Sequence, residues 1–106
     1  MDGNARIAQL EKVLAARPDE PFARYALALE HRSRGDLATA ASTLEELVKR
    51  TVNYVPAYLM LGQVLQQQDR IAEARAVLAA GQTQAKAKGD GHALSELTSA
   101  LTALGG

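Results

Sequence analysis

The chain has 106 residues, the size of one small domain, and 47% of them are hydrophobic, enough for a core of its own. Its twelve basic and twelve acidic residues cancel, so we expect neither nucleic acid nor an anionic membrane as a partner. It has no cysteine, which excludes disulfides and thiolate chemistry, and no visible secretory leader or apolar run of about 20 residues, so we expect a cytoplasmic protein.

The first predicted helix covers residues 4–17. Its apolar residues recur at spacings of three and four and so form one helical stripe: Ile7, Leu10, Val13 and Leu14. Asn4 or Asp2 is expected to cap the start of this helix. Pro18 ends it, because the residue before a proline avoids the helical region.

The second and third predicted helices meet at a glycine. Asp19 is expected to cap the second helix, with Pro21 in the first turn, where a missing N–H costs no hydrogen bond. Gly35 ends this helix in the left-handed conformation that lacks a Cβ clash. Asp36 then caps a third helix that runs to about Arg50.

The fourth and fifth predicted helices repeat this arrangement. Pro56 opens the fourth helix, and Asp69 occupies the turn position that Gly35 holds earlier. The fifth helix begins at about Ile71 and ends at Lys86 or Ala87.

The sixth predicted helix follows Gly89, with Asp90 as its cap. It carries leucines at spacings of three and four: Leu94, Leu97, Leu101 and Leu104. No segment alternates as a strand would. The sequence therefore predicts an all-α protein of six antiparallel helices with short turns.

One internal repeat relates residues 21–54 to residues 55–88 without a gap. The offset matches the period of about 34 residues that marks stacked helical hairpins. Identical residues recur at Ala23 and Ala57, Leu27 and Leu61, Ala38 and Ala72, Ala40 and Ala74, and Leu44 and Leu78. All are small or apolar, so we expect them to set helix packing.

In this register the chain resembles the tetratricopeptide repeat family, as a small two-repeat protein with flanking helices. The second repeat supplies Tyr58, Leu61, Gly62, Leu65, Asp69, Ala74, Leu78 and Gly81. The first repeat supplies Leu27, Ala28, Gly35, Ala40 and Leu44, with Arg24 and His31 where aromatic residues are common. Leu10, Val13 and Pro18 match the second half of a truncated repeat.

The resemblance implies a short right-handed superhelix of antiparallel helical hairpins, an α-α solenoid. It divides the single domain 1–106 into an N-terminal half-repeat helix (4–17), repeat 1 (21–54), repeat 2 (55–88) and a C-terminal capping helix (90–104). Small residues should let paired helices approach closely, with Ala28 facing Ala40 and Gly62 facing Ala74.

The resemblance also implies a non-enzymatic module that binds a peptide or partner protein through the concave face of the first helix of each repeat. The corresponding residues form the candidate groove: Phe22, Tyr25, Leu29, Arg32, Leu59, Gln63 and Gln66, with Pro56 beside them. A purely structural role is the competing interpretation, in which Phe22, Tyr25 and Leu29 pack against the first and last helices. The Lys and Asn residues with which some relatives clamp a C-terminal carboxylate are absent.

Two other function classes remain open. A homodimer could form through the groove or the leucine-rich last helix. An enzyme or small-ligand binder is disfavoured, because no catalytic constellation or phosphate-binding loop is present. His31 and His92 lie in different predicted helices without an obvious carboxylate partner, so we expect no metal and no cofactor.

Overall fold

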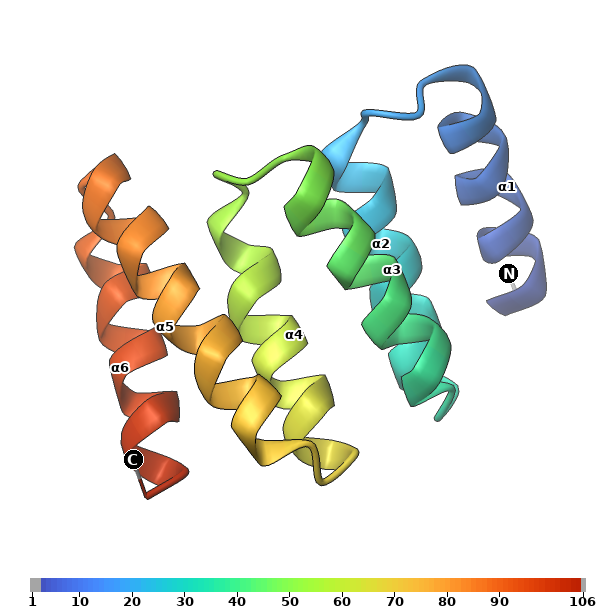
Figure 1. Ribbon diagram of the computed structural model, residues 1–106. Coiled ribbons are helices and arrows are strands. Elements are labelled where there is room, and N and C mark those ends of the chain that lie inside the picture. Colours follow the sequence, from blue (N-terminus) through green and yellow to red (C-terminus); the bar gives the residue numbers. More distant parts are fainter. Residues whose placement is uncertain (1–2, 106) are drawn as a thin grey trace.

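The computed structural model describes residues 3–105, and every regular element in that range is a helix (Figure 1). The helices are α1 (Gly3–Ala16), α2 (Pro21–Ser33), α3 (Leu37–Arg50), α4 (Val55–Gln67), α5 (Ile71–Lys88) and α6 (Gly91–Ala103). The all-α prediction with six helices is therefore confirmed.

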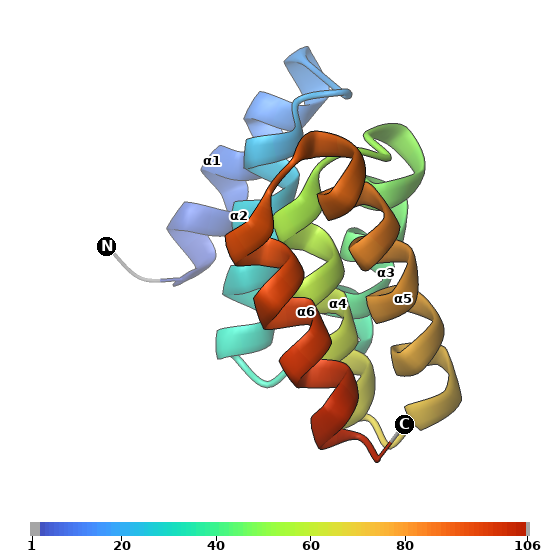
Figure 2. The same cartoon turned by 90° about the vertical axis from the view of Figure 1, so that its left-hand side faces the viewer.

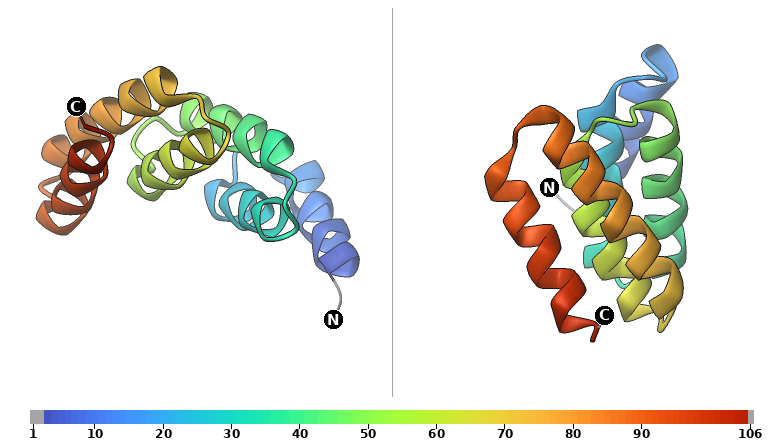
Figure 3. Two further views of the ribbon diagram at one scale, coloured as in Figure 1. Left: turned by 90° about the horizontal axis from the view of Figure 1, so that it is seen from below. Right: turned by 60° about the vertical axis from the view of Figure 1, so that its left-hand side comes forward.

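The helices form a curved two-layer array. Helices α2, α4 and α6 lie on one side and α3 and α5 on the other (Figure 2). Seen from below, the first set lines the inside of an arc and the second set covers its outside, with α1 at one end against α2 (Figure 3). Each helix packs against the next in sequence, and α6 also contacts α4. No helix within residues 3–105 is long and apolar enough to cross a membrane.

Two of the predicted helix caps are present. The Asp36 carboxylate accepts a hydrogen bond from the backbone N–H of Thr39 at 3.1 Å, and the Asp90 carboxylate accepts one from Ala93 at 3.0 Å. Each bond satisfies a backbone donor that the first helical turn leaves without a partner. The sequence therefore located the starts of α3 and α6 correctly.

The turn that follows each inner helix contains one residue in the left-handed conformation. Gly35 has φ 80° and Asp69 has φ 61°, which confirms that Asp69 takes the place of Gly35 in the second repeat. Asp adopts this conformation at some cost, because it carries a Cβ. Gly89, with φ 69°, ends α5 in the same way.

Two of the expected caps, Asp19 and Asn4, are wrong. Glu20 precedes α2 and makes no side-chain cap bond, while the Asp19 carboxylate instead accepts from the Arg50 guanidinium at 2.9 Å. Asn4 lies inside α1, where its Oδ1 accepts from Arg34 at 2.6 Å. Asp2 lies outside the described residues. The side chains of Asp19 and Asn4 therefore connect segments that are far apart in the sequence and do not cap the start of a helix.

The repeated identities occupy buried positions in all but one pair. In four of the five pairs, both residues have exposed fractions of 8% or less: Ala23 and Ala57, Leu27 and Leu61, Ala40 and Ala74, and Leu44 and Leu78. Ala38 and Ala72 are exposed, because each is the second residue of an outer helix, on the side away from the inner layer. The expectation that all the identities set packing is wrong for this pair.

Two glycines mark the closest helix contacts. A Cβ at Gly62 would lie 2.5 Å from Leu78 Cδ2, so Leu78 rather than the expected Ala74 is the nearest neighbour of Gly62 across α4 and α5. A Cβ at Gly81 would lie 2.6 Å from Tyr58 Cβ and 3.0 Å from Leu97 Cδ2. Gly81 therefore lets α5 approach α4 and α6 at the same point.

The leucines of α6 pack inward. Leu97 is 1% exposed in a cluster with Val55, Tyr58, Leu78 and Ala85, and Leu94, Leu101 and Leu104 cover that cluster from outside. Full burial of one leucine is worth about 1.5–3 kcal/mol. The apolar face of α6 thus packs within the chain, with Leu97 buried and Leu94, Leu101 and Leu104 half-buried.

We expect Gly81→Ala to lower the free energy of unfolding by about 1–3 kcal/mol, because the new methyl group overlaps the Cβ of Tyr58, which sits close to the α4 backbone. Gly91→Ala is the matched control. Nothing lies within 4 Å of a Cβ there, so this variant should be neutral or stabilised by up to about 1 kcal/mol. Urea denaturation of both variants measures the difference. Equal stabilities would contradict the close contact at Gly81.

A second prediction concerns the Asp36 cap. Hydrogen bonds from Thr39 lower the pKa of the Asp36 carboxyl below its usual value of 3.8. A lowered pKa stabilises the folded state above pH 3.8, and this contribution is lost as the pH falls through the folded-state value. Asp36→Ala should therefore lower the melting temperature at pH 7, and the gap to wild type should narrow below pH 3.8.

Asp36→Asn is the control for that experiment, because it keeps an oxygen acceptor at the cap but removes the charge. It should lose less stability than Asp36→Ala at pH 7. A gap between Asp36→Ala and wild type that does not change between neutral and strongly acidic pH would show that the negative charge of Asp36 does not contribute to stability.

Candidate functional site

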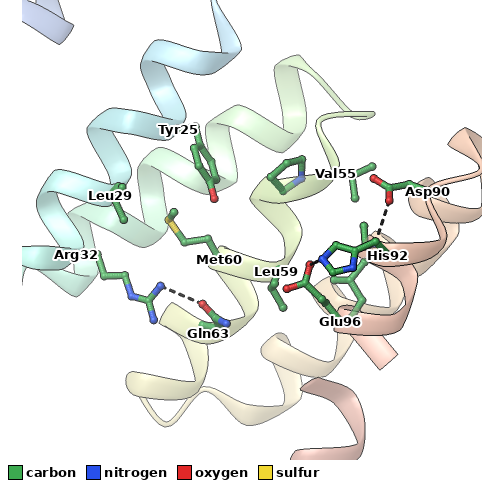
Figure 4. A pocket seen from close by; sticks show the side chains of 13 residues that line it. Tyr25, Leu29, Arg32, Val55, Leu59, Met60, Gln63, Asp90, His92 and Glu96 are labelled. Atoms are coloured by element: carbon green, nitrogen blue, oxygen red, sulfur yellow. Dashed lines mark hydrogen bonds and ion pairs between the residues drawn. The ribbon is translucent and has the colours of Figure 1, made fainter. Parts of the chain in front are cut away.

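The inner layer contains a hollow of about 480 Å³ between α2, α4 and α6 (Figure 4). We call it the inner-face hollow. It is lined by Tyr25, Leu29, Arg32, Val55, Pro56, Leu59, Met60, Gln63, Asp90, His92, Ala93, Glu96 and Leu97. It forms because the arc opens between α2 and α6, while α4 lies behind them as its base.

Apolar side chains from two helices form the middle of the hollow. Leu29 on α2 is 48% exposed, and Leu59 and Met60 come from α4. Tyr25 packs its ring against Tyr54, with ring centroids 5.6 Å apart and planes inclined at 58°. This aromatic contact holds Tyr25 at the edge of the hollow, where its ring adds to the apolar surface.

Arg32 connects two inner helices at one side of the hollow. Its Nη1 donates to Gln63 Oε1 at 3.0 Å and its Nε donates to Gln67 Oε1 at 3.2 Å. The two glutamine side chains on α4 therefore hold the guanidinium of α2 in a fixed position. Gln63 and Gln67 therefore use their side-chain oxygens within the chain.

The opposite wall is formed by α6 and is acidic. His92 Nε2 lies 3.3 Å from Glu96 Oε1, one helical turn away, and Asp90 stands at the start of the helix. In Figure 4, Asp90, His92 and Glu96 lie across Leu59 from Arg32. The hollow thus has a cation on the α2 side and carboxylates on the α6 side.

Tyr25 lies in the field of both walls. Burial raises the pKa of its hydroxyl, the nearby positive charge of Arg32 lowers that pKa, and the negative charge of Glu96 raises it. Charges on α2 and α6 therefore both act on one group at the edge of the hollow.

The structure brings five of the predicted groove residues together and leaves two outside. Tyr25, Leu29, Arg32, Leu59 and Gln63 line the hollow, as does Pro56. Phe22 in the first turn of α2 is 66% exposed, and Gln66 near the end of α4 is exposed and does not line it. Neither Phe22 nor Leu29 is buried against the first or last helix, which argues against a purely structural role for these two residues.

The α6 wall is the part that sequence reasoning missed. Asp90 was expected only as a helix cap, and the predicted groove included no residue of the last helix. The available signal was the alternation of layers, since a sixth helix falls on the same side as the second and fourth. The spacing of His92 and Glu96 then places both on one face of that helix.

Each histidine lies near a carboxylate, contrary to expectation. His31 Nδ1 lies 4.0 Å from Asp36 Oδ2, in addition to the contact between His92 and Glu96. Within residues 3–105, no three His, Asp or Glu side chains are grouped closely enough to hold a metal ion. Neither histidine contact has the number of ligands that a metal site requires.

Comparison with known proteins gives the same repeat architecture. Residues 4–81 match the family model described as anaphase-promoting complex, cyclosome, subunit 3. No curated protein matches the chain significantly.

The solved structures that resemble the chain include a tetratricopeptide repeat domain protein from Salinibacter ruber. In the comparison with its crystal structure, the two sequences are 36% identical, and the match covers 80% of this chain and 94% of the Salinibacter ruber chain, with a TM-score of 0.76. Its solution structure is 37% identical over 82% and 88% of the two chains, with a TM-score of 0.78.

A more distant structure shares the fold alone. The type III secretion translocator chaperone SycD of Yersinia enterocolitica is 14% identical, covers 92% of this chain and 68% of that chain, and has a TM-score of 0.84. The matched family model and the Salinibacter ruber protein together extend over most of the chain. The chain therefore belongs to the tetratricopeptide repeat family, which is generally a non-enzymatic scaffold for protein interactions.

Proposed function

We propose that the protein is a non-catalytic adaptor that binds a segment of a partner protein in the inner-face hollow. The observation that carries the proposal is the composition of this surface, in which the apolar side chains of Leu29 and Leu59 stand between polar groups of α2 and α6. Leu29 is 48% exposed, whereas every other leucine is buried or half-buried. Apolar anchors supply affinity in such a site, and the polar groups around them fix orientation.

The shape of the hollow favours one extended or helical segment. Three parallel-lying inner helices contribute to it, and about 480 Å³ is sufficient for a few side chains rather than for a folded domain. The family supports this interpretation, because its fold is that of a protein-interaction module. SycD, which shares the fold, is named as a chaperone, and a chaperone also binds other proteins.

The cytoplasmic location and the absence of nucleic-acid and membrane partners remain predictions from composition. Zero net charge removes a general attraction to polyanions. Fractionation of cells that produce the protein would test its location.

Leu59→Arg is expected to weaken peptide binding at least about tenfold, because it places a charge in the apolar middle of the hollow. Peptides selected from a random display library against the wild-type protein provide the ligand, and fluorescence anisotropy measures affinity. Ala79→Arg is the matched control, since Ala79 is exposed on the outer helix α5. Equal affinities of the two variants would place the site elsewhere.

Self-association is the second candidate, and one observation favours it. Phe22 is 66% exposed and Leu29 48% exposed, seven positions apart and so on one face of α2. Sedimentation velocity at high micromolar concentration separates the two functions. We expect a monomer. A dimer that Phe22→Ser converts to a monomer would favour self-association through α2.

A further inference from the structure

We propose that the inner-face hollow selects a partner segment with an acidic side chain for Arg32, a basic side chain for the α6 wall, and an apolar side chain between them. This inference rests on the proposed function and specifies the chemistry of the ligand. It follows from how the charges of the hollow are held and where they lie.

Arg32 is a positive charge that the chain orients but does not neutralise. Among the described residues, Arg6, Arg50 and Arg70 each have a carboxylate within 4.0 Å. In the same part of the chain Arg32 has none, like four other arginines, but of these five it alone lines the hollow. Its partners are the neutral oxygens of Gln63 and Gln67. An amide oxygen fixes the planar guanidinium without cancelling its charge, so Arg32 remains available for an anion.

The setting of Arg32 favours a carboxylate ligand. Arg32 is half-buried and lines the hollow together with the apolar side chain of Leu29, and a charge-assisted hydrogen bond is stronger in such a setting than in open water. Because two amides already restrict its rotation, binding a carboxylate costs little additional side-chain entropy. The acidic side chain of an Asp or Glu within the partner segment meets these requirements.

The α6 wall carries the complementary charge. Asp90 and Glu96 line the hollow, and no lysine or arginine of α6 does so. Within residues 3–105, His92 is the one basic side chain within 4.0 Å of Glu96, and it is 88% exposed. A basic side chain of the partner would therefore find a negative wall on this side.

The separation of the two walls sets the order of the side chains along the ligand. Arg32 and Glu96 lie on opposite sides of Leu59 and Met60 (Figure 4), and both charges act on the Tyr25 hydroxyl. A ligand that crosses the hollow meets a cation, an apolar surface and then a carboxylate. Only a segment with acidic, apolar and basic side chains in that order complements all three.

The experiment compares the peptides that a random display library yields against wild-type protein, Arg32→Gln and Glu96→Gln. Peptides selected on wild type should be enriched in Asp or Glu at one position and in Lys or Arg at another, on either side of an apolar residue. The acidic preference should disappear with Arg32→Gln and the basic preference with Glu96→Gln. Wild-type peptides should bind Arg32→Gln about tenfold or more weakly.

Matched controls separate charge at the hollow from net charge and from loss of structure. Arg17→Gln and Glu11→Gln change the same charges at exposed positions outside the hollow and should keep both preferences. Arg32→Lys keeps the positive charge but loses the planar donor, and it should keep the acidic preference with reduced affinity. Circular dichroism confirms that each variant is folded.

The outcomes distinguish this inference from the proposed function. Selected peptides that lose affinity with Leu59→Arg but show no charge preference, or keep it in Arg32→Gln, would overturn the inference and leave the binding site in place. Failure to select any peptide, or selection of peptides indifferent to Leu59→Arg, would overturn both. A preference for phosphorylated over acidic peptides at the Arg32 position would also contradict the assignment of a carboxylate.

Discussion

The meeting of three helices at Gly81 is the constraint on which the candidate site depends. A glycine at this point of α5 leaves room for Tyr58 of α4 and Leu97 of α6, at distances that a side chain would not allow. Leu97 is almost completely buried there, and the Tyr58 hydroxyl donates to the Val52 carbonyl at 2.6 Å, which ties the connector before α4 to the same cluster. One small residue thus fixes α4, α5 and α6 relative to one another.

The consequence for function is that α6 becomes part of the inner layer instead of a simple cap. Its leucines face the core, so its polar face, with His92 and Glu96, is left at the edge of the hollow. On the other side, Arg32 is held by Gln63 across α2 and α4. Packing on the buried faces and charge on the open faces are therefore set by the same helix orientations.

The sequence predicted the fold well because its signals were local. The Asp36 and Asp90 caps and the left-handed Asp69 each depend on residues within one or two turns. The parts it missed depend on contacts between distant segments. Asp19 looked like a cap, but Arg50 lies within reach only in the folded chain. The same is true of the glutamines that hold Arg32.

The position of α6 is the central claim, and nuclear Overhauser contacts test it directly. The structure predicts cross-peaks from the Gly81 Hα protons to the Hβ protons of Tyr58 and to a methyl group of Leu97, because both neighbours lie close to the open side of Gly81. Observation of both would place α4, α5 and α6 together as described. A spectrum with the Tyr58 contact but without the Leu97 contact would contradict the docking of α6 and remove the acidic wall of the hollow.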